Sequence, residues 1–382
     1  MGSISRGRSK HRPRNDERLF GGLYPFIQTA DVKSAELYIT DYSQSYSEFG
    51  LQQSKLWPIG TLCITIAANI ADTAILGIPA CFPDSIMGFN AYEGVANTKF
   101  VKYSFDILQK QCKQISQGAA QDNMSWEKLS TIEFPCPPIE VQNRIVAILC
   151  RYDDLILNYQ KQIRLLEEAA QRLYKDWFVD LHFPGYENVQ VVDGVPEGWE
   201  KKSMAQLGEY LNGFAFKPSD WQSKGKPIIK IKEMGNGVSL ETPRNNGERV
   251  PSKYLIHNGD LLFSWSATLM AMIWNGEEGW LNQHIFKVIP NEGVCREFLL
   301  QSIKNTICEF SNLTTGSTMK HIQRNKLEQV YVSVPPYNIM QKYQKLADKV
   351  REQILKLSSQ LRLLTEARNR LLPKLMSGEI AV

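Results

Sequence analysis

The sequence contains an internal duplication, in which similar residues recur 198 positions further along the chain. The pair Pro137-Pro138 recurs as Pro335-Pro336, and the run 164–166 (Arg-Leu-Leu) recurs as 362–364. A solenoid needs several stacked repeats to bury its core. Two copies instead predict a pair of similar domains, related by a pseudo-two-fold axis, that present two similar sites.

Each copy has the same internal order. Short β-like runs and turns come first, as in residues 226–232 and 260–265. The Pro-Pro pair follows, and it predicts a change from strand to helix, because proline fits the first helical turn and keeps the preceding residue extended. A long helical stretch then covers about 139–180 in the first copy and about 337–377 in the second.

The start of the first copy departs from this order. The second copy opens with residues 196–199 (Pro-Glu-Gly-Trp), and no similar run lies near Met1. We therefore expect the first strand of the first copy to be missing or to be supplied differently.

Both helical stretches carry one heptad pattern of apolar residues, with a stutter at the same place in each. A helix of about 40 residues is about 60 Å long, which no globular core requires. We therefore expect the two helices to pack together, antiparallel if the copies are related by a two-fold axis. The positions of this seam are Ile145, Ile148, Tyr152, Ile156, Tyr159, Ile163, Leu166, Ala170, Leu173 and Trp177, and Tyr343, Leu346, Val350, Ile354, Leu357, Leu361, Leu364, Arg368, Leu371 and Leu375.

Further apolar side chains lie off this seam, more of them than a two-helix pair can bury, which predicts contacts with partner helices. They are Leu155, Leu165, Tyr174, Phe178, Leu363 and Leu372, of which Leu155, Tyr174, Phe178 and Leu372 are the candidate partner-binding residues. The fold predicted from these patterns is α+β: two α/β domains, related by a pseudo-two-fold axis, separated by two long antiparallel coiled-coil helices.

Composition sets wide limits on function. Hydrophobic residues at 43% and charged residues at 22% are ordinary for a soluble globular protein, and a net charge of +4 permits binding to a polyanion without requiring it. The seven cysteines are scattered without a Cys-x-x-Cys pair, which argues against a disulfide scaffold and a zinc site and fits a reducing cytoplasm. The apolar stretch 60–82 contains Asn69 and Asp72, so it is expected to be buried sheet and not a membrane span.

Catalytic motifs are not found in the sequence. It lacks a phosphate-binding loop of the Gly-x-x-x-x-Gly-Lys-Ser/Thr type, and the five histidines show no metal-binding spacing. Residues 334–337 (Val-Pro-Pro-Tyr) resemble the loop with which adenine methyltransferases hold the target base, but Val334 lacks the side-chain oxygen that this chemistry needs. We therefore expect no catalytic residue, no bound metal and no bound cofactor in this chain.

Polar and basic side chains on loops are the remaining candidates for function. Such side chains suit hydrogen bonds to phosphates and to base edges. An arginine-rich N-terminal segment, a strand edge, a strand with two lysines and a polar loop supply them. The candidates are Arg6, Arg8, Lys10, Arg12 and Arg14; Gln28 and Thr29; Lys230 and Lys232; and Thr315, Ser317, Lys320 and Arg324. The N-terminal segment is equally consistent with a solvated, mobile end of the chain.

Several motifs resemble those of the specificity subunit of type I restriction–modification enzymes. They are Pro-Pro-x-x-x-Gln at 137–142, a similar run with one extra residue at 335–341, the opening run 196–199 and the closing run 371–380. The resemblance covers nearly the whole chain.

The resemblance implies two target-recognition domains, each of which reads one block of a split, asymmetric DNA site. They would cover residues 1–138, shortened at the N-terminus, and 186–334, with spacer helices at 139–185 and 335–382. The shortened first domain and Arg368 in the helical seam depart from the family pattern.

The resemblance also implies partners for a cytoplasmic, non-catalytic subunit that does not enter membranes. These partners are double-stranded DNA, two methyltransferase (modification) subunits that bind S-adenosylmethionine and, in some systems, ATP-dependent restriction subunits. Two other classes of protein remain as alternatives, a standalone DNA adenine methyltransferase and a structural coiled-coil scaffold. Sequence-specific DNA binding that needs a partner for methylation would distinguish the three.

Overall fold

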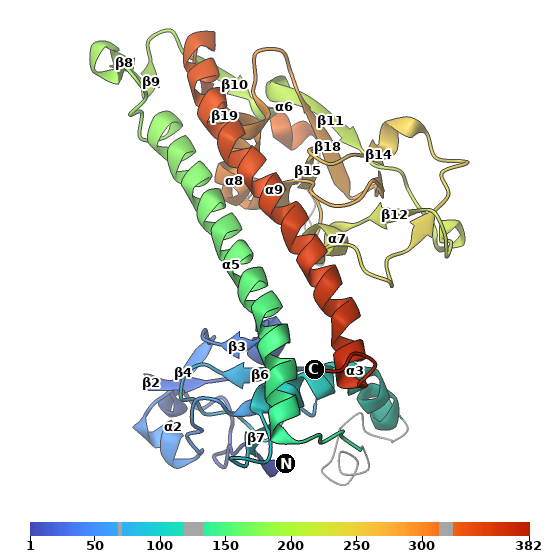
Figure 1. Ribbon diagram of the computed structural model, residues 1–382. Coiled ribbons are helices and arrows are strands. Elements are labelled where there is room, and N and C mark those ends of the chain that lie inside the picture. The colour runs from blue at the N-terminus through green and yellow to red at the C-terminus, as the bar shows by residue number, and fades with distance from the viewer. Residues whose placement is uncertain (68–70, 118–132, 313–323) are drawn as a thin grey trace. The chain divides into compact units, whose positions relative to one another are not determined.

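The computed structural model describes residues 1–67, 71–117, 133–312 and 324–382 (Figure 1). The chain divides into two compact units. Unit 1 contains Met1–Leu157 and Leu363–Val382, and unit 2 contains Asn158–Arg362. Two 40-residue helices, α5 (Ile139–Phe178) and α9 (Tyr337–Met376), each belong partly to both units. The domain boundaries expected at 138, 185 and 334 stay a prediction.

Unit 1 combines a five-stranded sheet with short helices and one longer helix. Besides its parts of α5 and α9, its elements are β1 (Gly2–Arg6), η1 (Glu17–Leu19), β2 (Phe20–Phe26), α1 (Thr29–Ser34), β3 (Tyr38–Ile39), β4 (Gln44–Tyr46), α2 (Glu48–Gln52), β5 (Leu62–Thr65), β6 (Thr73–Leu76), β7 (Ile86–Ala91) and α3 (Thr98–Gln117).

Unit 2 contains two four-stranded sheets, one of them made of short strands, and two separate two-stranded pairs. Its elements are η2 (Tyr186–Asn188), β8 (Val191–Val192), β9 (Val195–Pro196), β10 (Glu200–Ser203), α6 (Met204–Leu207), β11 (Gly208–Asn212), η3 (Pro218–Asp220), β12 (Lys226–Ile229), α7 (Ile231–Asn236), β13 (Arg244–Asn245), η4 (Ser252–Tyr254), β14 (Leu255–Ile256), β15 (Leu261–Ser264), β16 (Met270–Ile273), β17 (Gly279–Leu281), β18 (Ile285–Pro290), α8 (Arg296–Asn312), η5 (Arg324–Glu328) and β19 (Tyr331–Val334). The two separate pairs are β8 with β9 and β10 with β19.

The two units share one sheet plan. The order β1-β7-β5-β6 in unit 1 corresponds to β11-β18-β15-β16 in unit 2, and all neighbours in these runs are antiparallel. α3 packs against β6, and α8 packs against β16. The duplication inferred from the sequence is therefore also a duplication of the fold, and the α+β prediction is confirmed.

The described part of the stretch 60–82 contains buried sheet, as expected, and Asn69 lies outside the described residues. Every residue of β5 and β6 is buried, the two strands pair with each other, and β5 also pairs with β7. In the described part of the chain, no helix is both long enough and apolar enough to span a membrane.

The edge strand of unit 1 is present. β1 pairs with β7 from Gly2 opposite Ala91 to Arg6 opposite Met87, so it takes the place that β11 has in unit 2. The described part of unit 1 shows no counterpart of β10, which pairs with β19 in unit 2, and residues 133–138 have no regular structure. The N-terminal difference between the copies is thus the β10–α6 segment.

The long helices pair antiparallel within each unit. In unit 1, Ile145 and Leu149 near the start of α5 share an apolar cluster with Leu372 and Leu375 near the end of α9. In unit 2, Phe178 at the end of α5 contacts Tyr343 near the start of α9, with ring centroids 4.8 Å apart. Each unit therefore contains the first-copy helix beside the second-copy helix in opposite directions (Figure 1).

The prediction that Tyr174, Phe178 and Leu372 face a partner is wrong. All three are buried within the chain. Tyr174 Oη lies 3.0 Å from Ser302 Oγ on α8, Phe178 contacts Phe298, and Leu372 packs in the cluster at the start of α5. The prediction counted only what two helices can bury and left out the globular part of each unit.

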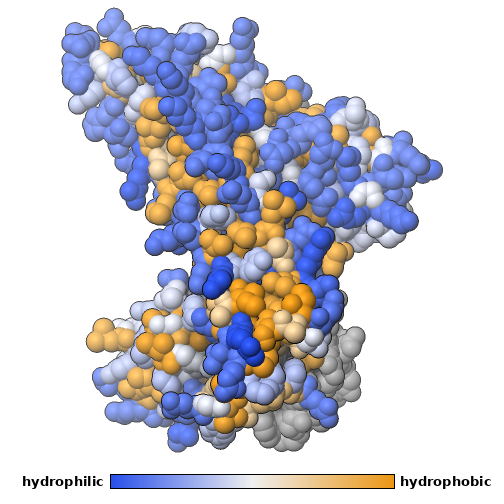
Figure 2. Space-filling model, in the orientation of Figure 1, coloured by the Kyte–Doolittle hydropathy of each residue, from blue (hydrophilic) through white to orange (hydrophobic). Residues whose placement is uncertain are grey.

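Leu155 remains a candidate partner contact. Its side chain on α5 is 43% exposed, and two further off-seam leucines, Leu165 and Leu363, are 50% and 58% exposed. Figure 2 shows hydrophobic residues at the surface along α5 among hydrophilic ones. Exposed leucines of this kind do not contribute to the core of the chain.

The Pro-Pro pairs lie directly before the helices. Pro138 O accepts the backbone N–H of Gln142, and Pro336 O accepts the backbone N–H of Met340. Gln142 is fully buried, and Met340 is buried at the equivalent place in unit 2. Gln341 is the glutamine that ends the longer motif at 335–341 and so corresponds to Gln142 in the motif comparison, but its side chain is exposed.

Candidate nucleic-acid interface

The arginine-rich segment of unit 1 is held by hydrogen bonds to two neighbouring loops. After β1, Arg8 N donates to Phe82 O at 3.1 Å, and Lys10 N donates to Gln53 O at 3.1 Å. Ser54 Oγ donates to Arg8 O at 2.7 Å. The backbone of residues 8–10 therefore follows a defined path, and its role in binding stays a prediction.

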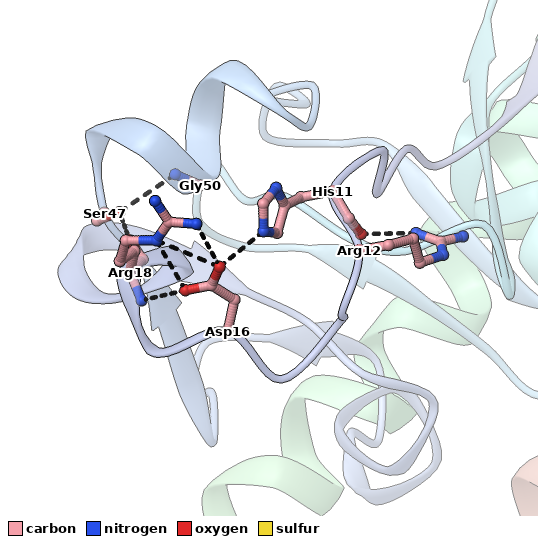
Figure 3. A network of polar contacts seen from close by, with 6 residues as sticks. All are labelled: His11, Arg12, Asp16, Arg18, Ser47 and Gly50. Atoms are coloured by element: carbon pink, nitrogen blue, oxygen red, sulfur yellow. Dashed lines mark hydrogen bonds and ion pairs between the residues drawn. The ribbon is translucent and has the colours of Figure 1, made fainter.

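One carboxylate organises the following turn (Figure 3). Asp16 accepts hydrogen bonds from Arg18 Nη2 at 2.7 Å and Arg18 Nε at 3.1 Å, and its Oδ2 lies 2.7 Å from His11 Nε2. The hydrogen bond with the Arg18 guanidinium is the main cause that holds the pKa of Asp16 well below its usual range. Arg12 turns back on the same loop, because its Nη1 donates to Ser9 O and His11 O.

Besides Arg12, the basic side chains of this segment fall into two groups. Arg14 pairs with Asp84 at 2.8 Å, and Arg18 pairs with Asp16. Arg6, Arg8 and Lys10 are exposed, and no described carboxylate lies within ion-pair distance of them. These three side chains can therefore pair with phosphate groups without first losing an internal partner.

Gln28 lies next to this segment. Phe26 pairs with Cys81, Ile27 N donates to Cys81 O at 2.8 Å, and Arg8 binds the next residue, Phe82. The short stretch 81–82 thus has Arg8 on one side and the residue before Gln28 on the other. The sequence separates these two candidates by 20 residues, and the fold brings them to one place.

Local hydrogen bonds hold Gln28 at the start of helix α1. Asp31 Oδ2 accepts the backbone N–H of Gln28 at 2.7 Å, which caps helix α1. Gln28 Nε2 donates to Gln44 Oε1 at 2.7 Å, and both Gln28 and Thr29 are half-buried.

Lys230 occupies the same position in unit 2. Ile228 pairs with Trp280 as Phe26 pairs with Cys81, and Glu233 Oε2 accepts the backbone N–H of Lys230 at 3.1 Å. The prediction that Lys230 and Lys232 lie on a strand is wrong, because β12 ends at Ile229 and α7 begins at Ile231. The Glu233 side chain at the third helical position forms a capping box, which outweighs the alternating Lys-Ile-Lys pattern.

The two lysines have different surroundings. Lys230 Nζ lies 5.2 Å from the ring centroid of Trp221, a cation–π contact. Lys232 Nζ lies 3.8 Å from Glu241 Oε2, and both side chains are exposed.

Thr315, Ser317 and Lys320 lie outside the described residues, and Arg324 is the first residue of η5.

Two glycines mark positions that the motif analysis missed. Gly7 N donates to Ile86 O, and Gly213 N donates to Ile285 O at the equivalent place. A Cβ atom at Gly7 would lie 2.3 Å from Pro83 O, and one at Gly213 would lie 2.2 Å from Asn282 O, so neither site accepts a side chain. The sequence signal for these positions is a glycine directly after an edge strand in each copy. The residue before it is Arg6 in unit 1 and Asn212 in unit 2, so these two residues are equivalent in the repeat.

Comparison with known proteins gives consistent matches. The family model for the type I restriction modification DNA specificity domain matches residues 1–168 and 196–362. The type I restriction enzyme MjaIX specificity subunit of Methanocaldococcus jannaschii is 25% identical, covering 95% of this chain and 88% of that protein. The HindI specificity subunit of Haemophilus influenzae is 26% identical, covering 69% and 72%.

A solved structure has the same fold. The crystal structure of the type I restriction–modification S subunit from M. genitalium superposes with a TM-score of 0.53 at 13% identity, covering 98% of this chain and 93% of that one. The family match and the fold match both include the two copies of the repeat.

Proposed function

This chain belongs to the family of type I restriction–modification DNA specificity subunits, and we propose that its two units each read one block of a split, asymmetric DNA site. The observation that carries this proposal is the pair of equivalent positions with different side chains. Gln28 in unit 1 and Lys230 in unit 2 stand at the same place in one sheet plan. Equivalent positions with different hydrogen-bonding groups suit two blocks of different sequence.

The candidate contacts divide by chemistry. Exposed guanidinium and ammonium groups suit the phosphates, and uncharged polar side chains suit base edges. We assign Arg6, Arg8, Lys10, Arg12 and Arg14 mainly to phosphates. The base-edge candidates are Gln28 and Thr29 in unit 1 and Thr315 and Ser317 in unit 2. Lys230, Lys232, Lys320 and Arg324 of unit 2 carry cationic groups that can bind either a phosphate or a guanine edge.

Methylation belongs to partner subunits in this proposal. Two modification subunits would bind S-adenosylmethionine and transfer the methyl group, and ATP-dependent restriction subunits would join in systems that have them. The exposed Leu155 is a candidate contact for such a partner. The purified chain with S-adenosylmethionine and DNA, but without partners, should transfer no methyl group; transfer under those conditions would favour the standalone methyltransferase.

The long helices would set the spacer between the two DNA blocks. Each unit contains part of α5 and part of α9, so both helices connect the two units. A change in the length of either helix therefore changes the connection between them. Deleting one heptad from α5 or α9 should alter the tolerated spacer, or abolish binding, without changing the bases read. An unchanged spacer preference in a folded variant would show that the helices do not set it.

A segment exchange tests the two-reader model directly. Residues 200–330 are replaced by the equivalent segment of a related specificity subunit, and methylated bases are mapped by sequencing host DNA. One block of the site should change and the other should stay. If both blocks change together, the two units do not read independently.

A further inference from the structure

The repeat identifies a place in unit 2 that corresponds to the arginine segment of unit 1. Gly7 and Gly213 make the same hydrogen bond to the first residue of β7 and β18 respectively. The residue before Gly7 is Arg6, and the residue before Gly213 is Asn212, which is exposed at the end of β11. Unit 2 therefore carries an amide where unit 1 carries a guanidinium.

We propose that Asn212 and Gln283 form a DNA contact of unit 2, with their amide NH2 groups donating to hydrogen-bond acceptors on base edges. This inference rests on the proposed function of the chain. Gln283 lies in the turn between β17 and β18 that Gly213 contacts, and its counterpart in unit 1 is Asp84, the partner of Arg14. In the proposal the two residues act together at one end of the unit 2 sheet.

The orientation of the Asn212 amide follows from its neighbour. Trp265 Nε1 donates to Asn212 Oδ1 at 3.1 Å. An indole N–H can only donate, so the atom that faces it is the amide oxygen and the NH2 group is the other end of the side chain. Trp265 is itself held in place, with its ring centroid 5.7 Å from that of His284 and 5.8 Å from that of Phe286.

The Gln283 amide is oriented by a similar sequence of contacts. Asn282, 5% exposed, accepts the backbone N–H of His284 at its Oδ1 over 3.4 Å. Its Nδ2 therefore faces Gln283 Oε1 at 2.6 Å. With the oxygen of Gln283 bound in this way, its NH2 group is the end of the side chain that does not face Asn282. Two donor groups are thus preset before any DNA arrives, which lowers the entropy lost on binding.

Neutral donors have an effect on binding that differs from that of arginine. A phosphate contact by a cation releases counterions and appears in the salt dependence of affinity, whereas an uncharged amide contact does not. Loss of a base-edge contact weakens binding to the cognate site and leaves binding to other sequences unchanged. The ratio of cognate to non-cognate affinity is therefore the informative quantity.

The test uses the full chain assembled with the proposed modification subunits. The probes are a duplex with the methylated site mapped in host DNA and a duplex with that site scrambled. Asn212→Ala and Gln283→Ala are the main variants, and Trp265→Phe removes the N–H that orients Asn212. Asn258→Ala is the matched control, because Asn258 is an exposed amide in the turn at the other end of β15.

Each alanine variant should lose roughly tenfold in affinity for the cognate duplex. Affinity for the scrambled duplex and the slope of affinity against salt should stay at the wild-type values, Trp265→Phe should show a smaller loss, and Asn258→Ala none. The inference is overturned if Asn212→Ala and Gln283→Ala keep the wild-type ratio of cognate to scrambled affinity, either because neither affinity falls or because both fall equally. Either result leaves the proposed function standing. Equal binding of the wild-type complex to both duplexes overturns the proposed function itself.

Discussion

Arg368 of α9 forms an ion pair with Asp153 of α5, with 3.7 Å between Arg368 Nη1 and Asp153 Oδ1. The Asp153 side chain is only 10% exposed, and its Oδ2 also accepts a 2.5 Å hydrogen bond from Tyr103 Oη of α3. Burial, and next this hydrogen bond, raise the pKa of Tyr103. An arginine in an apolar seam is therefore explained by a buried carboxylate on the facing helix.

The equivalent place in unit 2 is different. The residue 198 positions after Asp153 is Arg351, and the residue 198 positions before Arg368 is Ala170. Ala170 and Arg351 line one cavity, and Arg351 pairs with Glu297 of α8 at 2.7 Å and with Asp348 at 2.9 Å. The apolar seam is repeated in both copies, but the ion pairs at these equivalent positions differ between the two units.

Arg368→Ala should destabilise unit 1 by about 2–3 kcal/mol, because it leaves the Asp153 carboxylate buried without a cation. Hydrogen exchange measured by mass spectrometry should speed up in α3 and in the first turns of α5. Arg370→Ala is the control, since Arg370 is 78% exposed and its pair with Glu366 lies on the surface. Equal effects of the two variants would show that the ion pair is no stronger than a surface pair.

Gln142→Met should destabilise the chain by about 2–3 kcal/mol. Gln142 Oε1 accepts the Asn97 backbone N–H at 3.0 Å, and its Nε2 donates to Val95 O at 3.1 Å and Pro137 O at 2.8 Å. Methionine occupies the equivalent position in unit 2, but it cannot satisfy these backbone groups in unit 1. Urea denaturation measures the difference.

Gln341→Ala is the matched variant for this experiment. Gln341 is exposed, so its loss should change the free energy of unfolding by less than about 0.5 kcal/mol. A loss at Gln341→Ala as large as that at Gln142→Met would mean that Gln341, and not Met340, is the counterpart of Gln142.

Periodic patterns in the sequence predicted the large elements well. The heptad spacing and the Pro-Pro pairs predicted α5 and α9, whose start points are one residue after each pair. The β-branched run at 60–82 predicted β5 and β6. These signals depend only on residues close together in the sequence, so the elements that they predict can be recognised without knowing the tertiary structure.

Side-chain environments were not predictable in the same way. Burial of Tyr174 depends on α8, which lies more than 120 residues further along the chain, as the contact with Ser302 shows. The pairing of Asp153 with Arg368 and of Trp265 with Asn212 also joins distant segments. The alternating Lys-Ile-Lys pattern predicts a strand at Lys230, whereas the capping box with Glu233 favours a helix that begins after it. Only the three-dimensional contacts show which of the two prevails.

Asp16→Asn should loosen the arginine loop at neutral pH but not at low pH. The folded-state pKa of Asp16 lies below its ordinary value of about 4. The stabilisation is therefore complete above that ordinary pKa and is lost as the pH falls through the folded-state pKa. The gap in thermal-unfolding midpoint between wild type and variant should shrink steadily below about pH 4. A gap that stays constant down to pH 3 would mean that the charge of Asp16 has no part in it.

Replacing Arg6, Arg8 and Lys10 together by alanine should weaken binding to every duplex, cognate or scrambled. Each lost phosphate contact lowers the slope of log affinity against log salt by about 0.9, so three contacts should lower it by about 3. Specificity, the ratio of the two affinities, should stay near its wild-type value, because phosphates carry no sequence information. The matched control removes the same charge from α5, with Arg151, Lys161 and Arg164, all exposed, replaced by alanine. Filter-binding titrations from low to moderate salt measure both slopes, and an equal decrease in the two triple variants would reduce the effect of the N-terminal segment to net charge alone.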